Sequence, residues 1–174
     1  MRSGEPGTIL PALTRRDAVS AERASFCGTY RHSVDPKGRV AVPAQLRRDL
    51  PEGSVVAPGP DRRLRIMPPS EWRREQEAFR RTAETPEQAR RFLRELVGNA
   101  YPFEVDAQGR LLLSAAQRRW ADIHDNAVFV GLGSAVELAG ERLWRSNQPE
   151  LDPDEFTRLH DLVHRADDER EFQP

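Results

Sequence analysis

Two aspartate–arginine pairs occur at the same spacing in two parts of the chain. Asp35 precedes Arg39 by four residues in the segment VDPKGRV, and Asp106 precedes Arg110 by four residues in VDAQGRL. An aspartate at the first position of a turn accepts hydrogen bonds from the turn's own amides, and a glycine at the fourth position tolerates a positive φ. Each segment therefore predicts a hairpin that presents an arginine where the returning strand begins.

Arginines presented in this way suit nucleic-acid recognition. The planar guanidinium can bridge phosphate oxygens or contact O6 and N7 of guanine. A turn with a local ion pair would explain one copy, but two copies with the same pair are more than turn formation requires. Lys37 and Gln108 occupy the matching position at the two tips, where a lysine can contact a phosphate. The candidate DNA-binding residues are Asp35, Lys37, Arg39, Asp106, Gln108 and Arg110.

Other chemistries find less support in the sequence. Asp35 and Asp106 could form an acid–base pair if a twofold arrangement brought them together. Their turn positions and nearby arginines instead favour two ionised carboxylates. His160 and His164 are spaced to chelate a metal from one helix face, but no cysteine or carboxylate at ligand spacing supports them. We expect no enzyme, metal, cofactor or small-molecule ligand.

The repeat continues beyond the two turns. The apolar segments 54–57 and 127–130 correspond, as do 64–66 and 136–138, at offsets close to the 71 residues that separate the aspartates. Each turn is followed by a short apolar strand and a short helix that begins at a proline or a serine. One duplicated unit explains this pattern, and it predicts two fused half-units that share a core.

Composition limits the remaining possibilities. The 174 residues carry a net charge of -1 and a mean hydropathy of -0.72. No apolar run approaches the roughly 18 residues that span a bilayer, so we expect no membrane contact and a cytoplasmic location. Cations outnumber acids between residues 26 and 82, whereas the tail is acidic. One part of the chain can therefore meet an anion while the tail stays away from it.

These patterns divide the chain into five parts. We expect a disordered extension at 1–25, a first repeat at 26–84, a connecting helix at 85–99, a second repeat at 100–145, and an acidic helix and tail at 146–174. The extension lacks apolar periodicity and is rich in glycine and proline. The tail combines one apolar helical face with many acidic residues.

Capping signals mark three helices. Ser70 can begin one helix, and Thr85 with Gln88 forms a capping box for the next, which Gly98 ends. The apolar stripe of this second helix can pack on the preceding helix and the strands, or on a neighbouring subunit. A further capping box starts at Asp152 and opens the acidic helix, which could dock within the chain, bridge subunits or bind a partner.

The ordered motifs resemble those of the MraZ family. The likeness covers about residues 26–144 and rests on GTY at 28–30, the two Asp-x-x-Gly-Arg segments, VPA at 42–44 and the closing Trp144. It implies an α+β, mainly β, fold of two fused AbrB-like swapped-hairpin half-units with a pseudo-twofold axis, plus connecting and C-terminal helices. The second copy departs from the family at Ser114, which replaces a proline, and at Ala107, which replaces a frequent lysine.

The resemblance also implies a function. Members of the family form homo-oligomeric rings, bind direct repeats of double-stranded DNA upstream of their own division and cell-wall operon, and use Asp35, Arg39, Asp106 and Arg110 for contact. It implies a nucleoid-associated transcriptional regulator. Family chains begin near Phe26, so the leading segment is expected to be an extension or the result of an upstream start codon. The alternative is an antitoxin-like interaction module whose acidic C-terminal helix binds a protein partner.

Overall fold

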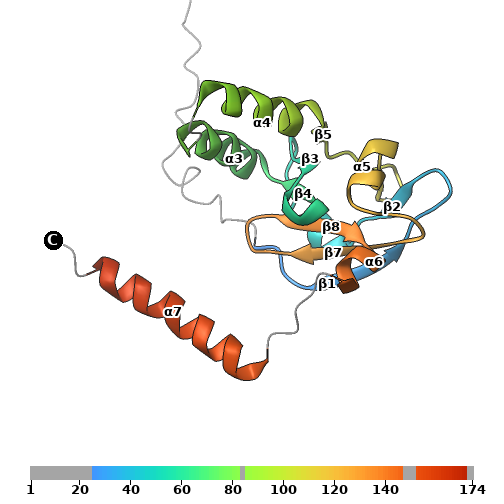
Figure 1. Ribbon diagram of the computed structural model, residues 1–174. Helices are drawn as coiled ribbons and strands as arrows, with labels where there is room; N and C mark the ends of the chain where they lie inside the picture. Colours follow the sequence, from blue (N-terminus) through green and yellow to red (C-terminus); the bar gives the residue numbers. More distant parts are fainter. Residues whose placement is uncertain (1–24, 83–84, 147–151, 172–174) are drawn as a thin grey trace, which may run out of the picture. The chain divides into compact units, whose positions relative to one another are not determined.

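The computed structural model describes residues 25–82, 85–146 and 152–171, and the side chains of the last helix only as far as residue 162 (Figure 1). The extension expected at 1–25 therefore lies outside the described residues, apart from its last residue. The chain divides into two compact units, Met1–Glu141 and Arg142–Pro174. The candidate DNA-binding residues all belong to the first unit.

Two β-sheets form the centre of the first unit. Six strands are ordered β1–β7–β8–β4–β3–β5, and β2 and β6 form a separate pair; all pairings are antiparallel. The strands are β1 (Thr29–Ser33), β2 (Arg39–Ala41), β3 (Val55–Pro58), β4 (Leu64–Met67), β5 (Tyr101–Pro102), β6 (Arg110–Leu112), β7 (Asn126–Gly131) and β8 (Val136–Gly140). With the helices described below, this confirms the expected α+β class.

Strands from the two sequence copies pair with each other. β1 pairs with β7, β4 pairs with β8, and β2 pairs with β6 with Val40 opposite Leu111. Each expected hairpin is closed on itself only by single bridges, Val34 to Val40 and Val105 to Leu111. The turns form as predicted, but each returning strand continues onto the other copy rather than along its own hairpin.

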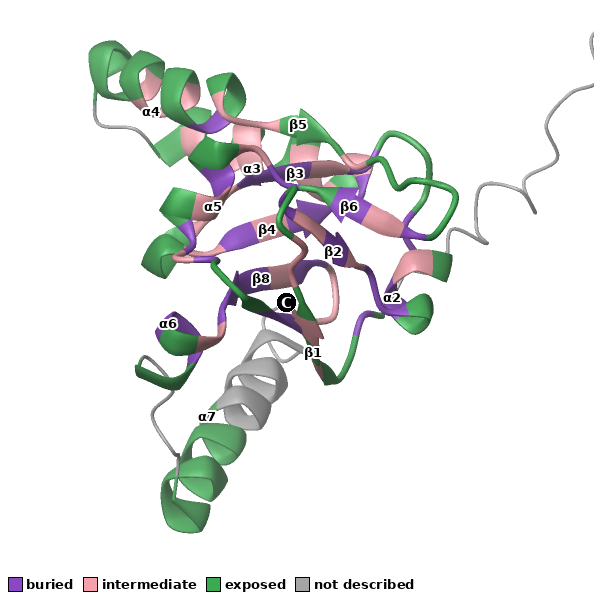
Figure 2. Cartoon of the chain, turned by 90° about the vertical axis from the view of Figure 1, so that its right-hand side faces the viewer, coloured by how far each residue is buried: buried purple, intermediate pink, exposed green. Residues whose placement is uncertain are grey.

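The core of the first unit draws on both copies. Val40 and Leu111 are almost fully buried, together with Val42 and Leu113 just beyond them and Phe129 on β7. Buried stretches of β2 and β8 are purple in Figure 2. Successive residues of a strand point to opposite faces. The burial of Val40 and Leu111 therefore turns their neighbours Arg39 and Arg110 toward the other face of the β2–β6 pair.

Short helices follow the returning strands in both copies. They are α2 (Ala44–Arg48) and α5 (Ala115–Trp120). Ser114 begins α5 as predicted: its Oγ accepts a hydrogen bond from the Gln117 N–H at 3.2 Å, and Gln117 Oε1 accepts one from the Ser114 N–H at 2.9 Å. Pro43 holds the matching position before α2 without a side-chain cap.

A helical hairpin connects the two copies. α3 (Pro69–Thr82) and α4 (Pro86–Gly98) pack together through Phe79 and Phe92, whose ring centroids lie 3.7 Å apart. Leu96 is buried against Met67 and the neighbouring strands, which confirms packing on the preceding helix and the sheet.

The predicted caps of these helices are mostly present. Thr85 Oγ1 accepts a hydrogen bond from the Gln88 N–H at 3.1 Å, and α4 ends at Gly98. The cap predicted at Ser70 is wrong, because α3 already begins at Pro69 and the Trp72 N–H donates to the carbonyl of Pro68.

The remaining helices follow β8. They are α6 (Glu141–Ser146) and α7 (Pro153–Glu171). Asp152 caps α7, because its Oδ1 accepts hydrogen bonds from the N–H groups of Asp154 at 2.9 Å and Glu155 at 2.8 Å. Phe156, Leu159 and Leu162 lie on the predicted apolar face and are exposed. Among the described residues, no helix has the length and apolarity to cross a bilayer.

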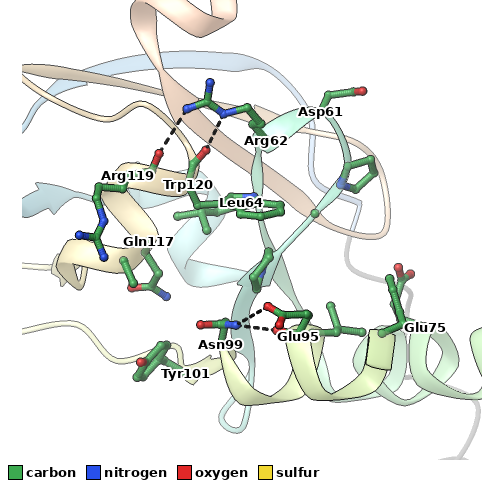
Figure 3. A pocket seen from close by; sticks show the side chains of 16 residues that line it. Asp61, Arg62, Leu64, Glu75, Glu95, Asn99, Tyr101, Gln117, Arg119 and Trp120 are labelled. Carbon is green, nitrogen blue, oxygen red and sulfur yellow. Dashed lines mark hydrogen bonds between the residues drawn. The ribbon is translucent and has the colours of Figure 1, made fainter. Parts of the chain in front are cut away.

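A groove of about 950 Å³ opens beside the β3–β4 loop, α4 and α5 (Figure 3). The loop contains the 3-10 helix η1 (Pro60–Arg62) and is tied to the end of α5. Arg62 Nε donates to the carbonyl of Trp120 at 3.3 Å, and Trp120 Nε1 donates to the carbonyl of Arg63 at 3.0 Å. Tyr101 and Trp120 on the groove wall keep 44% and 43% of their surface exposed.

Candidate nucleic-acid interface

The first turn is held by the Asp35 carboxylate. Its Oδ1 accepts hydrogen bonds from the N–H groups of Lys37 and Arg39, both at 2.9 Å, and its Oδ2 accepts one from Arg39 Nε at 2.6 Å. The Gly38 N–H closes the turn on the Asp35 carbonyl at 2.8 Å. Gly38 has φ of 81°, which favours glycine there. One aspartate thus shapes the backbone and orients the arginine.

The second turn repeats this network. Asp106 Oδ1 accepts from the N–H groups of Gln108 at 2.9 Å and Arg110 at 3.0 Å, and Oδ2 accepts from Arg110 Nε at 2.8 Å. The Gly109 N–H donates to the Asp106 carbonyl at 2.8 Å, and its φ is 73°. The turn chemistry predicted from the aspartate and glycine positions is therefore present in both copies.

Both carboxylates are held in the ionised form. The backbone hydrogen bond from Arg39 lowers the pKa of Asp35 below its ordinary value, and the side chain of Arg39 lowers it further. The pKa of Asp106 is lowered to about 2, first by the side-chain hydrogen bond from Arg110 and then by the backbone hydrogen bonds from Arg110 and Gln108. This argues against a catalytic pair sharing one proton, since that chemistry requires one carboxyl with a raised pKa.

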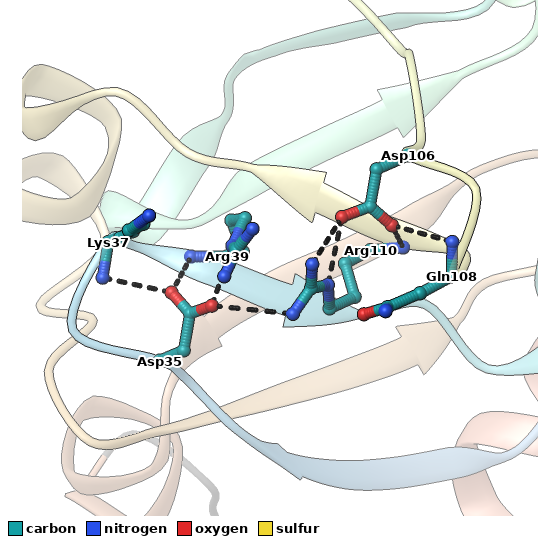
Figure 4. Close-up of polar contacts among 6 residues, drawn as sticks. All are labelled: Asp35, Lys37, Arg39, Asp106, Gln108 and Arg110. Carbon is teal, nitrogen blue, oxygen red and sulfur yellow. Dashed lines mark hydrogen bonds and ion pairs between the residues drawn. The ribbon is translucent and has the colours of Figure 1, made fainter.

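The β2–β6 pairing brings the two turns together. Ala41 lies opposite Arg110 in the ladder, and Arg110 Nη1 lies 3.7 Å from Asp35 Oδ2. Figure 4 shows Asp35, Arg39, Arg110 and Asp106 in one cluster, with Lys37 at one end and Gln108 at the other. All six residues predicted from the sequence therefore lie on one surface, which we call the two-turn surface.

The arginines of this surface are half-buried. The side chains of Arg39 and Arg110 are 30% and 26% exposed. Leu112, opposite Arg39 across the strand pair, is 61% exposed. The surface therefore combines fixed guanidinium groups with one apolar side chain, and both kinds of group can contact base edges in a DNA groove.

Sequence reasoning missed two arginines beside these turns. Arg47 on α2 lies against Gly109 of the second turn, and Arg118 on α5 lies against Gly38 of the first turn. Both follow the turns at the same distance in the two copies, separated by the same 71-residue offset as the aspartates. That match was the available signal, although only the fold places each arginine on the opposite turn.

The possible metal site on α7 gains no support. Within the described part of the chain, no group of three His, Cys, Asp or Glu side chains can hold a metal ion. The ring of His160 stacks on Phe156 at 6.2 Å between centroids, and the side chain of His164 lies outside the described residues.

Known proteins resemble the chain over about two thirds of its length. Residues 25–95 match the family model described as "MraZ protein, putative antitoxin-like". "Transcriptional regulator MraZ" of Desulfitobacterium hafniense is 40% identical over 119 residues, which cover 68% of this chain and 83% of that protein. The chain belongs to the MraZ family. The protein of the same name from Heliobacterium modesticaldum is 39% identical over 68% of this chain and 83% of its own length. The one from Roseiflexus castenholzii is 36% identical over 70% of this chain and 85% of its own length.

Membership of the MraZ family confirms the resemblance seen in the motifs. The relatives are named as transcriptional regulators, which is not a class of enzyme, so the predicted function is confirmed at that level. The matched segment 25–95 includes the first turn and Arg47, whereas the second turn lies beyond it.

Proposed function

We propose that this chain is a sequence-specific DNA-binding regulator that contacts the major groove with the two-turn surface. In this proposal Arg39 and Arg110 contact base edges, while Asp35 and Asp106 hold their guanidinium groups in position. Lys37 and Gln108 occupy the two tips, so the two turns need not contact the same bases. The site of action is the nucleoid in the cytoplasm, on DNA upstream of the protein's own division and cell-wall operon.

The observation that carries the proposal is the matched pair of Asp–Arg turns on one antiparallel strand pair. A two-stranded ribbon fits the major groove, which is about 12 Å wide. Each aspartate bonds the Nε of its arginine, which restricts the orientation of the guanidinium plane. Such preorganisation lowers the entropy lost when the arginine contacts a base.

Assembly into a ring on direct repeats is part of the same proposal. The chain has a net charge of -1, so a single subunit offers limited attraction to phosphates. Several subunits on one scaffold engage repeated sites at a high effective concentration. The groove supports self-association through its exposed Tyr101 and Trp120, since interfaces are enriched in such aromatic side chains.

Fluorescence anisotropy tests the proposal. Wild type is compared with Arg39→Ala/Arg110→Ala on DNA from upstream of its own gene and on a scrambled duplex. A control, Arg91→Ala/Arg94→Ala, removes the same charge from exposed positions on α4. We expect only the turn variant to lose its preference, by roughly 5- to 150-fold per contact, from about 1 to 3 kcal/mol for a good arginine–guanine pair. A wild-type protein without preference would exclude sequence-specific binding.

The number of repeats provides a separate test of assembly. We expect much weaker binding to a duplex with one repeat than to one with several repeats in phase, because only the second engages several subunits. Equal affinities for the two duplexes would contradict the ring while leaving the two-turn contact intact.

A second candidate is an antitoxin-like module that binds a protein partner through α7. The exposed apolar residues Phe156, Leu159 and Leu162 favour it, because they lie along one face of an acidic helix. The variant Phe156→Ala/Leu159→Ala/Leu162→Ala separates the two functions. Under the first proposal it keeps the preference for its own DNA, and under the second it loses the partner.

A further inference from the structure

The two-turn surface has little net charge of its own. Arg39 pairs with Asp35, and Arg110 pairs with Asp106 and also approaches Asp35, so two guanidinium groups face two carboxylates. Lys37 is the remaining cation among the six residues. Affinity for DNA depends strongly on the number of phosphates that cations neutralise. Further cations are therefore needed close to the turns.

Arg47 and Arg118 have the required properties. Each lies in the last turn of the short helix that follows a returning strand, and each is half-buried. Neither guanidinium forms a hydrogen bond or ion pair with any other residue in the described ranges, and Arg118 Nε is buried without a partner. Burying part of a cation without a counter-ion is unfavourable, so an anion that binds beside it would be stabilised.

Each of these arginines lies against the turn of the other copy. A Cβ added to Gly38 would lie 2.9 Å from Arg118 Nε, and one added to Gly109 would collide with Arg47 Nη1. The two guanidinium groups therefore flank the two-turn surface at equivalent positions. A DNA duplex with its major groove on the turns would bring its phosphates to the sides of the same strand pair.

We infer that Arg47 and Arg118 bind DNA phosphates beside the opposite turns. This inference rests on the proposed function. Arg47 and Arg118 supply affinity for DNA of any sequence, whereas Arg39 and Arg110 supply the preference for one base sequence over another. The fold places one phosphate contact next to each base-contacting arginine, on both sides of the pseudo-twofold arrangement.

The test is a salt titration of DNA binding by full-length Arg47→Gln/Arg118→Gln. The logarithm of the binding constant falls with the logarithm of salt concentration by about 0.9 per neutralised phosphate. We expect the slope to decrease by roughly 1.8 for each engaged subunit, and affinity to fall equally on the upstream and scrambled duplexes. The ratio between the duplexes should stay at the wild-type value.

Two controls complete the design. Arg91→Gln/Arg94→Gln removes the same charge from α4 and should keep the wild-type slope, because α4 lies away from β2 in both views of the first unit (Figures 1 and 2). Arg47→Lys/Arg118→Lys keeps the charge but not the planar guanidinium. A phosphate contact predicts a wild-type slope for the lysine variant, whereas a purely structural role predicts no rescue.

The outcomes separate this inference from the proposed function. Two results would refute the phosphate contacts and leave the proposed function in place. In both, wild type prefers its own DNA, and Arg47→Gln/Arg118→Gln either keeps the full salt slope or loses the preference between the duplexes. If the double glutamine variant fails to fold, the single variants Arg47→Gln and Arg118→Gln decide: a slope reduced by about 0.9 per engaged subunit supports the inference, and a wild-type slope refutes it. If wild type shows no preference for its own DNA, the proposed function itself fails.

Discussion

Three glycine-to-alanine substitutions would separate backbone strain from side-chain contact in this fold. Gly109 has φ of 73° and lies against Arg47. Gly133 has φ of 75°, but an added Cβ would meet nothing within 4 Å. Gly98 ends α4 outside the left-handed region, and its surroundings are equally open.

The expected stability changes follow from these differences. The left-handed conformation costs an L-residue about 1–2 kcal/mol, so Gly109→Ala and Gly133→Ala should both destabilise by that amount. The contact with Arg47 adds little to the first change, because the far end of a long flexible side chain can move away. Gly98→Ala should stabilise the protein by about 0.4–1 kcal/mol, since alanine restricts the unfolded chain.

Urea unfolding followed by circular dichroism measures these changes, and the salt titration of DNA binding adds a second readout. Gly109→Ala must displace the Arg47 guanidinium, so it should lower the salt slope by about 0.9 per engaged subunit if Arg47 binds a phosphate. Gly133→Ala is the matched control, because it carries the same strain without contact to an arginine. Its salt slope should equal that of wild type.

Specific results would refute this reasoning. A neutral Gly133→Ala would show that positive φ is not costly at that turn, and a destabilising Gly98→Ala would contradict the open helix end. A Gly109→Ala variant that is several kcal/mol less stable than Gly133→Ala would show that Arg47 is held rigidly against the turn.

Three further predictions concern pH, the core and a helix cap. Asp106 has a pKa of about 2 in the folded protein against an ordinary 3.8, so its contribution to stability is full above about pH 4 and is lost as the pH falls toward 2. In Asp106→Asn the free energy of unfolding should depend less on pH over that window, and a pH profile equal to that of wild type would contradict this. Leu138→Ala removes a fully buried side chain and should lower the free energy of unfolding in urea by about 2–5 kcal/mol. A loss below about 1 kcal/mol would show that the neighbouring side chains fill the cavity. Ser114→Ala should cost about 1 kcal/mol through loss of the bond from the Gln117 N–H, and an unchanged melting temperature would show that the cap is dispensable.

Features that depend on neighbouring residues could be predicted well. The two turns require only an aspartate, a glycine and the amides between them, all within five residues. The caps at Thr85 and Ser114 and the helix end at Gly98 likewise use atoms one helical turn apart. The cap predicted at Ser70 lies two residues too late, because α3 begins at Pro69 and the carbonyl of Pro68 already accepts the Trp72 N–H.

The sequence also identified the six residues of the candidate site, because duplication repeated their types and spacing. It could not determine which strands pair. The returning strands have three residues each, and nothing in their composition distinguishes pairing within a hairpin from pairing between copies. Burial of Val40 and Leu111 in one shared core requires the second arrangement.

The sequence by itself thus determined the two turns, the caps at Thr85 and Ser114, and the positions of Arg39 and Arg110 at the turn ends, since these follow from local chemistry and repetition. Tertiary structure decided that Arg110 reaches Asp35, and that Arg47 and Arg118 cross to the opposite turns. These contacts join residues about 60 to 80 positions apart and exist only after β2 and β6 pair. Their physical cause is the burial of apolar side chains from both copies in one core, which no local pattern specifies.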